Sequence, residues 1–269
     1  MNTPAQPPEL PELVHPILAL LLDSVRAILG DELVGLYLYG SLSSGDFDPA
    51  SSDVDFVAVT QGAITGEDSA FERLREMHTQ IAASGFPFAH HLEGSYIPRA
   101  AWRRYNPADA RHPTIGADWP FQIGFHDANW IIERAIVRER GIVLYGPPPA
   151  TLIDTVTPEQ LRAATCQQMA IVWRSRVADD QYDHWPRPRL YPAFAVLTFC
   201  RALYTLEYGA FCSKPVAAAW VSERYPDWRP TIAWALAHRA DHDETTPAEF
   251  ADVLALLRAA LAETQARCQ

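Results

Sequence analysis

Residues 39–56 read Tyr-Gly-Ser-Leu-Ser-Ser-Gly-Asp-Phe-Asp-Pro-Ala-Ser-Ser-Asp-Val-Asp-Phe. One apolar run ends at Gly40 and Ser41, and a second apolar run follows Asp53 and Asp55. This order predicts two strands joined by a polar loop. Because Gly40 has no Cβ, the backbone can turn sharply there and come close to a ligand.

The two ends of this loop carry complementary chemistry. Ser41 offers a hydroxyl and nearby amides to an anion, as loops that bind phosphates do. Asp53 and Asp55 stand two apart on the expected strand, so both carboxylates leave the same face. Mg²⁺ is commonly held by one or two carboxylates together with substrate phosphates. Gly-Ser and Asp-x-Asp are each common in ordinary turns, but together they predict a metal–nucleotide site.

The combination resembles the signature of the nucleotidyltransferase superfamily with DNA polymerase β-like folds, in which Gly-Ser is followed at a distance by Asp-x-Asp. That resemblance implies a third carboxylate on a later, neighbouring strand, which acts as metal ligand or general base. Glu93 lies in residues 86–98, which we expect to form a strand. Glu93 either points to solvent or faces Asp53 and Asp55, and the superfamily pattern favours the second arrangement.

Composition bounds the class of protein. With 269 residues, the chain has room for one large domain or two of ordinary size, and 48% apolar and 20% charged residues are typical of a soluble globular protein. A net charge of −11 argues against a general nucleic-acid binder. The longest apolar stretch near the N-terminus, residues 17–22, is too short to span a bilayer. The four cysteines form no CxxC pair, so we expect free thiols in a reducing cytoplasm.

The order of expected elements predicts an α+β fold. Residues 1–149 are expected to form a mixed sheet flanked by helices, and residues 150–269 an all-α helical bundle. Residues 99–124 show no clear period and are expected to be irregular. Gly146 and three prolines after it mark the joint. The remaining expected elements are helices at 13–29, 67–83, 126–138, 158–177, 192–208, 215–223, 230–240 and 247–266, and strands at 33–39, 53–59 and 142–145.

Two further stretches narrow the family. Residues 140–148 and 196–220 resemble the domain joint and the helical domain of the aminoglycoside (3″)(9) adenylyltransferases. The resemblance implies ATP as co-substrate, with Gly40, Ser41 and Ser52 near its phosphates. It also implies Asp53 and Asp55 as Mg²⁺ ligands and Glu93 as catalytic base. Two basic residues of the helical domain, Arg201 and Lys214, are implied to reach the ATP.

Lys214 is the only lysine among 22 basic residues. A compact ammonium at this position suits contact with a triphosphate. The alternative is that Lys214 is a surface lysine that was retained by chance.

The acceptor side departs from the family. Tyr191 stands where the family has an aspartate that contacts streptomycin. Asp183 and its acidic neighbours could supply negative charge instead, and Trp119 and Trp185 could stack on the acceptor. This departure weakens the prediction of streptomycin as the acceptor, but it does not affect the prediction of nucleotidyl transfer.

The sequence therefore predicts Mg²⁺-dependent transfer of AMP from ATP to a hydroxyl of an aminoglycoside-type antibiotic, with release of pyrophosphate. Nucleotidyl transfer to another small molecule, or to a protein hydroxyl as in antitoxin-like enzymes, is the alternative. We expect a cytoplasmic monomer with a small cationic acceptor, and no nucleic-acid or membrane partner. The nine histidines lack the HExxH spacing of a zinc hydrolase.

Overall fold

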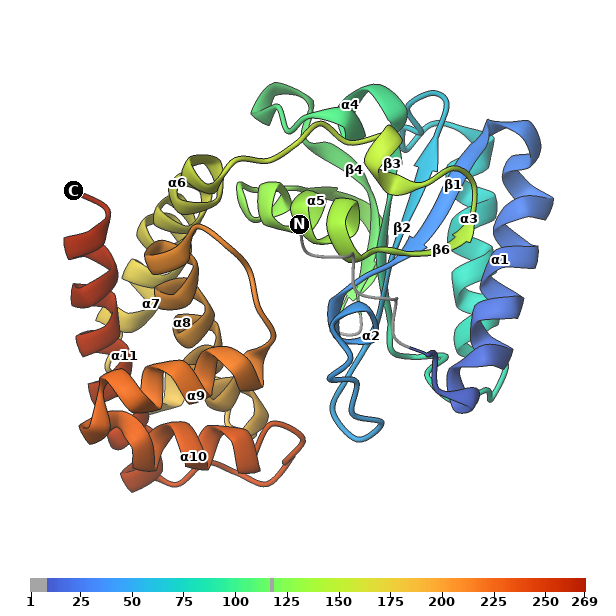
Figure 1. The fold of residues 1–269 in the computed structure, drawn as a ribbon. Helices are drawn as coiled ribbons and strands as arrows, with labels where there is room; N and C mark the ends of the chain where they lie inside the picture. The colour runs from blue at the N-terminus through green and yellow to red at the C-terminus, as the bar shows by residue number, and fades with distance from the viewer. Residues whose placement is uncertain (1–8, 117–118) are drawn as a thin grey trace. The chain divides into compact units, whose positions relative to one another are not determined.

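The computed structural model describes residues 9–116 and 119–269 (Figure 1). These residues form two compact units that divide after Thr155. We call them the sheet unit and the helical unit. The prolines at 147–149 begin the connector, which continues through a 3-10 turn, Pro149–Thr151. Arg138 holds this connector to the sheet unit by donating to the carbonyls of Ala150 and Ile153, both at 2.6 Å.

The sheet unit contains a six-stranded mixed sheet in the order β5-β4-β3-β2-β1-β6. Strands β2 and β3 are parallel, and every other neighbouring pair is antiparallel. The expected α+β class is confirmed. The strand bounds are β1 (Leu33–Leu38), β2 (Val54–Thr60), β3 (Leu92–Pro98), β4 (Arg111–Gly116), β5 (Trp119–Phe125) and β6 (Ile142–Tyr145).

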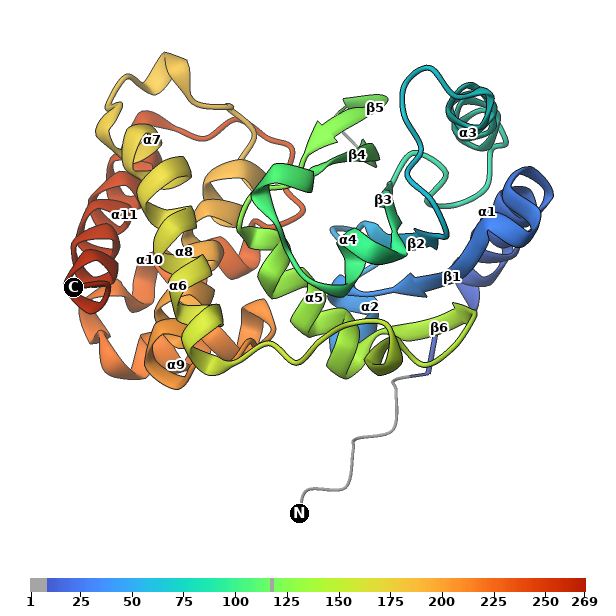
Figure 2. The same cartoon turned by 90° about the horizontal axis from the view of Figure 1, so that it is seen from above.

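Helices cover both faces of this sheet. Figure 2 shows α1 (His15–Leu29) and α3 (Ser69–Ala82) on one face, and α4 (Arg99–Arg103) and α5 (Asn129–Arg140) on the other. Successive residues of a strand point to opposite faces. Accordingly Phe56 packs in the core beneath α1 and α3, whereas Val57 and Ile97 pack in a second core with residues of α4 and α5.

The first helix is more apolar than we expected. By length and composition alone, residues Glu12–Glu32 could cross a membrane, a longer segment than the stretch 17–22 considered from the sequence. In the structure, the apolar stripe of α1 is buried against the sheet and α3, with Ile17, Leu21 and Val25 fully covered. This is the packing of a core helix.

Most of the described residues in the segment 99–124, which was expected to be irregular, lie in regular secondary structure, so that prediction is wrong. It contains α4 and the antiparallel pair β4–β5. Pro113 and Pro120 lie inside these strands, and polar residues on the exposed face obscure the alternation that reveals a strand. The strand expected to start at residue 86 begins only at Leu92.

The helical unit agrees closely with the expected helices. Thr157 and Thr246 each begin a helix with a capping box, and α8 runs through the core of the unit. The predicted helix at 158–177 is observed as α6, a π-helical turn and α7. The bounds are α6 (Pro158–Gln168), the π turn (Met169–Trp173), α7 (Arg174–Ala178), α8 (Leu190–Tyr208), α9 (Lys214–Arg224), α10 (Arg229–Ala237) and α11 (Pro247–Arg267).

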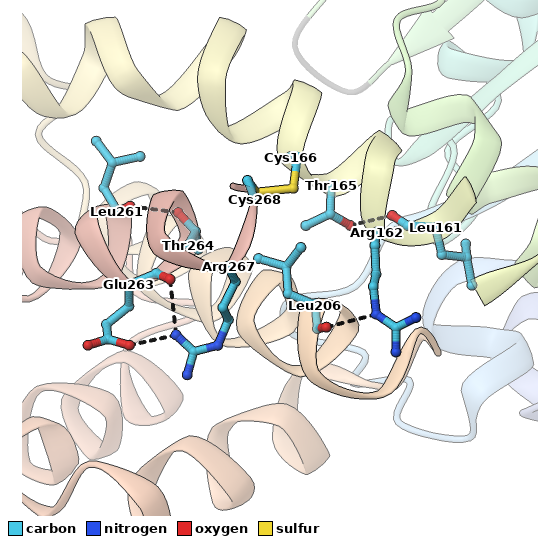
Figure 3. Close-up of a disulfide and its surroundings, with 10 residues drawn as sticks. All are labelled: Leu161, Arg162, Thr165, Cys166, Leu206, Leu261, Glu263, Thr264, Arg267 and Cys268. Atoms are coloured by element: carbon cyan, nitrogen blue, oxygen red, sulfur yellow. Dashed lines mark hydrogen bonds and ion pairs between the residues drawn. A yellow bond between two sulfur atoms is a disulfide. The ribbon is translucent and has the colours of Figure 1, made fainter. Parts of the chain in front are cut away.

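Two of the cysteines are not free thiols, contrary to prediction. Cys166 on α6 and Cys268 just after α11 form a disulfide across 102 residues of sequence (Figure 3). Their Cα atoms lie 5.7 Å apart, which is the ordinary spacing for such a bond. Cys200 and Cys212 remain reduced. No local pattern marks a pair so distant in sequence.

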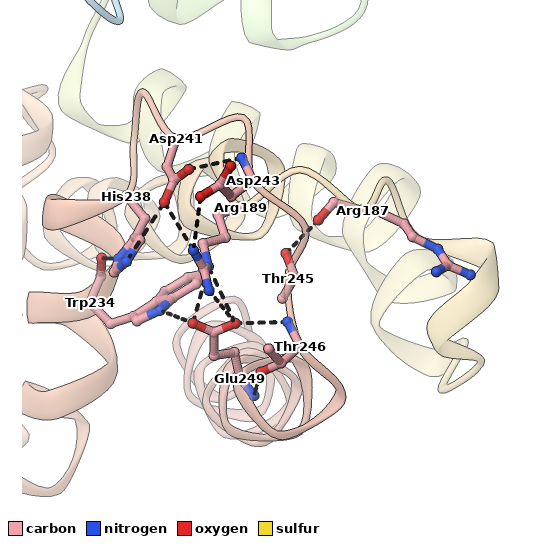
Figure 4. Close-up of polar contacts among 9 residues, drawn as sticks. All are labelled: Arg187, Arg189, Trp234, His238, Asp241, Asp243, Thr245, Thr246 and Glu249. Atoms are coloured by element: carbon pink, nitrogen blue, oxygen red, sulfur yellow. Dashed lines mark hydrogen bonds and ion pairs between the residues drawn. The ribbon is translucent and has the colours of Figure 1, made fainter.

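A polar cluster around Arg189 ties the start of α8 to the start of α11 (Figure 4). The Arg189 guanidinium binds Glu249 at 3.1 Å and Asp241 at 3.2 Å. Glu249 also accepts hydrogen bonds from the Trp234 indole at 3.1 Å and the Thr246 amide at 2.7 Å. The cluster joins three segments of the unit through charge-assisted hydrogen bonds.

Candidate active site

The register of β2 and β3 places two carboxylates side by side. Asp55 pairs with Glu93 in this parallel ladder, so the two side chains leave the same face of the sheet on neighbouring strands. That face is the one covered by α4 and α5, because Val57 and Ile97 share it. Of the two orientations open to Glu93, the structure therefore has the one that faces the Asp-x-Asp motif.

Gly40 is required by the close approach of the loop to Asp55. Its φ is +61°, and a Cβ at this position would lie 1.9 Å from Oδ2 of Asp55. Any side chain here would collide with the carboxylate and would also strain the backbone. The short helix α2 (Gly40–Ser44) therefore begins directly against one of the predicted metal ligands.

The two predicted phosphate-binding serines differ in their engagement. The Oγ of Ser41 is buried and has no hydrogen-bond partner in the described part of the chain. Such a group is costly unless a ligand or water satisfies it. Ser52 accepts a hydrogen bond from the Asp48 amide at 3.0 Å, and its own amide donates to the Asp48 carbonyl. These two hydrogen bonds hold the end of the loop at Ser52 to Asp48.

Asp53 has a neighbour that the sequence analysis missed. Nδ1 of His91 lies 3.1 Å from Oδ1 of Asp53. His91 precedes Glu93 by two residues, as Asp53 precedes Asp55, so the two pairs follow one register. That spacing is a signal in the sequence which could have placed His91 on this face.

A further carboxylate, Glu133 on α5, also belongs to this region. Burial raises the pKa of Tyr39, and the charges of Glu133, Asp55 and Glu93 raise it further. One phenol therefore lies within electrostatic reach of three carboxylates. Glu133 accepts a hydrogen bond from the Asn129 side chain at 2.9 Å. No local pattern in the sequence marks Glu133, because only the packing of α5 brings it here.

The donor set fits Mg²⁺ bound together with a nucleotide. Among residues 9–116 and 119–269, no three His, Cys, Asp or Glu side chains form a ready-made metal cage. Mg²⁺ does not need one, since substrate phosphates and waters complete its shell. Asp53 and Asp55 supply the pair of hard oxygen ligands for such an arrangement.

Trp119 lies on the other face of the sheet, where it lines a pocket together with Arg75, His78 and Thr79 of α3. A Cβ on Gly116 would meet the Trp119 ring at 2.4 Å, so the ring covers this glycine. Trp119 is 44% exposed. Its predicted contact with an acceptor stays a prediction.

The other predicted residues lie in the helical unit. Arg201 and Phe194 are seven residues apart on α8 and share one side of it. Nζ of Lys214, the first residue of α9, lies 4.9 Å from the centre of the Phe194 ring. Lys214 and Arg201 therefore occupy the same side of this unit.

The three remaining acceptor candidates have different environments. Trp185 is buried against Phe250, and its indole donates to the Asp179 carbonyl. Its ring packs in the core of the helical unit, and its predicted contact with an acceptor stays a prediction. Asp183 is exposed and pairs with Arg187. Tyr191 is half-buried in the first turn of α8.

Comparison with known proteins gives three likenesses. Residues 151–263 match the family model of the aminoglycoside adenylyltransferase C-terminal domain. Spectinomycin 9-adenylyltransferases of Staphylococcus aureus strains Mu50 and N315 are each 24% identical over 249 residues, which is 87% of this chain and 88% of theirs. The crystal structure of the spectinomycin adenyltransferase AAD(9) from Enterococcus faecialis, with ATP and spectinomycin, superposes with a TM-score of 0.71. That match is 18% identical and covers 92% of this chain and 99% of the other, and it shows a shared fold.

Proposed function

We propose that this chain, which belongs to an aminoglycoside adenylyltransferase-like family, transfers AMP from ATP to a hydroxyl of an aminoglycoside-class antibiotic. The observation that carries the proposal is the pairing of Asp55 with Glu93 beside Gly40 and Ser41. It brings possible metal ligands, a possible base and a phosphate-binding hydroxyl to one face of one sheet.

The reaction balances as follows. The acceptor hydroxyl oxygen forms a bond to the α-phosphorus of ATP, and its proton passes to Glu93. The bond from that phosphorus to the bridging oxygen breaks, and pyrophosphate leaves with the electron pair. Mg²⁺ held by Asp53 and Asp55 would supply charge neutralisation at the attacking and leaving oxygens.

The chain's other residues bind and orient the nucleotide. The unpartnered Ser41 hydroxyl donates to a phosphate oxygen, which removes its burial cost. Lys214 and Arg201 offset the charge of the departing pyrophosphate. Phosphoryl-transfer catalysis depends mainly on such positioning and charge stabilisation.

Spectinomycin is the acceptor to test first, because the named relatives are spectinomycin adenylyltransferases. The net charge of −11 favours a cationic acceptor. Tyr191, in place of an acidic residue, disfavours streptomycin. Transfer to a protein hydroxyl is the second candidate, and the match of the helical unit to an aminoglycoside family argues against it.

The test is pyrophosphate release from MgATP with spectinomycin, streptomycin or no drug. We expect drug-dependent release that falls by about 10²–10³-fold in Glu93→Gln, because a positioned base contributes that much. Glu76→Gln, an exposed carboxylate on α3, is the matched control and should retain the rate. Lys214→Ala should raise the KM for ATP.

If no drug stimulated pyrophosphate release although calorimetry showed that MgATP still binds, the proposed acceptor class would be refuted. An undiminished rate in Glu93→Gln would refute the role of the base.

A further inference from the structure

Behind Glu93 lies a buried chain of hydrogen bonds that the reaction scheme leaves unused. Ser95 follows Glu93 by two residues on the same face of β3 and is fully buried. Its Oγ lies 3.0 Å from Oγ1 of Thr114 on β4 and 3.0 Å from Nε2 of His126. Thr114 in turn donates to the Gly94 carbonyl at 3.0 Å.

The direction of this chain follows from counting protons. A carbonyl only accepts, so the single hydroxyl proton of Thr114 goes to Gly94. Thr114 must then accept the proton of Ser95, and Ser95 must accept from His126. His126 is therefore the Nε2-protonated tautomer, and its Nδ1 is buried without a partner in the described residues.

His126 is fixed on its other sides as well. Its ring stacks on Trp130 of α5, with centroids 3.8 Å apart and planes 5° apart. The Tyr105 hydroxyl donates to the His126 carbonyl at 3.2 Å. Burial, together with the neighbouring His112 and Arg134, lowers the pKa of His126 to about 2. The ring is thus neutral at physiological pH, and the order of donors cannot reverse.

The chain lies on the side of β3 where the backbone ladder is shorter, because β2 pairs with all of residues 92–98 whereas β4 pairs with only two residues of β3. The β3–β4 register comprises only Gly94 with Ile115 and Ser95 with Thr114. Glu93 lies at the end of this short ladder. On the other side, Gly94 is confined because a Cβ there would lie 2.4 Å from the Phe56 ring. The hydroxyl chain therefore clamps β3 at the residue next to Glu93.

We propose that His126, Ser95 and Thr114 are positioning residues that hold Glu93 for proton abstraction. The catalytic part of this inference rests on the function proposed above. A base displaced by about 1 Å loses about 10²-fold in rate, whereas substrate binding by other groups is unaffected. The three residues touch neither the nucleotide nor the acceptor and act through the backbone of β3.

The test compares two threonine-to-valine changes. Thr114→Val keeps the side-chain shape but removes the link to Gly94. Thr60→Val is the matched control, because Thr60 is buried on the neighbouring strand and donates to the Gly62 carbonyl at 2.7 Å. We expect Thr114→Val to lower kcat for spectinomycin-dependent pyrophosphate release by about 10–100-fold. The KM for ATP should stay within about two-fold. Thr60→Val should keep the wild-type kcat, even if it lowers the melting temperature as much as Thr114→Val does.

A second measurement needs no turnover. Hydrogen exchange at residues 92–95 should become at least about ten-fold faster in Thr114→Val and Ser95→Ala than in Thr60→Val. Unchanged exchange there, or equal losses of kcat in Thr114→Val and Thr60→Val, would overturn the inference. A wild-type protein that releases no pyrophosphate with any drug would instead refute the proposed function, while exchange still decides whether the clamp exists.

Discussion

The sheet unit and the helical unit hold their parts together by different means. In the sheet unit, the His126–Ser95–Thr114 chain and the 2.8 Å contact of His78 with Tyr96 join separate elements through buried, uncharged groups. The helical unit uses the half-exposed charges around Arg189 and a disulfide.

The difference follows from what each unit has to position. Buried hydrogen bonds in a medium of low dielectric are strong and directional when every partner is present. They suit a site in which one carboxylate must keep its place against another. Partly exposed ion pairs are weaker and screened by salt, but they suffice to join helix ends within the helical unit.

Acidification should produce the largest difference in stability between the two units. Burial lowers the pKa of His78 to about 3, and burial is also the main cause that brings His126 to about 2. Unfolded histidine titrates near pH 6.5, so both rings stabilise the fold fully above that pH. As the pH falls below it, only the unfolded chain takes up protons, and each ring costs about 1.4 kcal/mol per pH unit.

Between about pH 6.5 and 4.5 the loss sums to about 5 kcal/mol, which is comparable with the whole stability of many domains. Urea titrations at each pH, read peptide by peptide through hydrogen exchange, should show the sheet unit opening first. His78→Gln should reduce by about one the number of protons that the chain takes up on unfolding in this pH range. If α8 and α11 lost protection from hydrogen exchange before the sheet did, this prediction would be contradicted.

Removal of the disulfide should act on the helical unit alone. The double variant Cys166→Ala/Cys268→Ala should lose about 3 kcal/mol, because a tether across 102 residues restricts the unfolded chain. Calorimetric melting with and without dithiothreitol measures this loss. The reductant should lower the melting temperature of the wild type and leave the double variant unchanged. A wild type indifferent to reductant would show that the tether contributes nothing.

The smallest expected effect concerns Glu249. Burial raises its pKa, but hydrogen bonds from Thr246, Trp234 and Arg189 outweigh burial and bring it to about 2. Its stabilisation is therefore present above the unfolded pKa and is lost as the pH falls through about 2.

Glu249→Gln should cost about 1 kcal/mol at pH 7, after allowance for solvent screening, and progressively less between about pH 4.5 and 2. Urea unfolding of the helical unit measures it, with the exposed Glu244→Gln as control. A cost that does not shrink with acid would assign the effect to packing instead of charge.

Sequence patterns predicted the helical unit better than the outer sheet. Helix α11 was expected at 247–266 and is observed at Pro247–Arg267, because its apolar spacing and its proline start are local signals. Strands β4 and β5 lack such signals, since Pro113 and Pro120 interrupt them.

Within the site, the same distinction applies. Asp53, Asp55 and Gly40 share one local motif, and Glu93 was found because a lone carboxylate in an apolar strand matched a family pattern. Glu133 enters the site through tertiary packing, which no spacing in the sequence encodes. The burial of Trp185 could not be predicted, because one aromatic residue in a loop looks the same in the sequence whether it is buried or exposed.

The position of Lys214 over Phe194 has a practical consequence for chemical probes. Lys214 carries the only side-chain amine in this sequence, since every other basic residue is an arginine. An acylating reagent carried by a nucleotide analogue would thus have a single lysine to modify. Mass spectrometry would find one peptide labelled on lysine, and ATP should protect it in proportion to occupancy. The arginine-rich composition of this chain turns an ordinary lysine reagent into a selective reporter of one position.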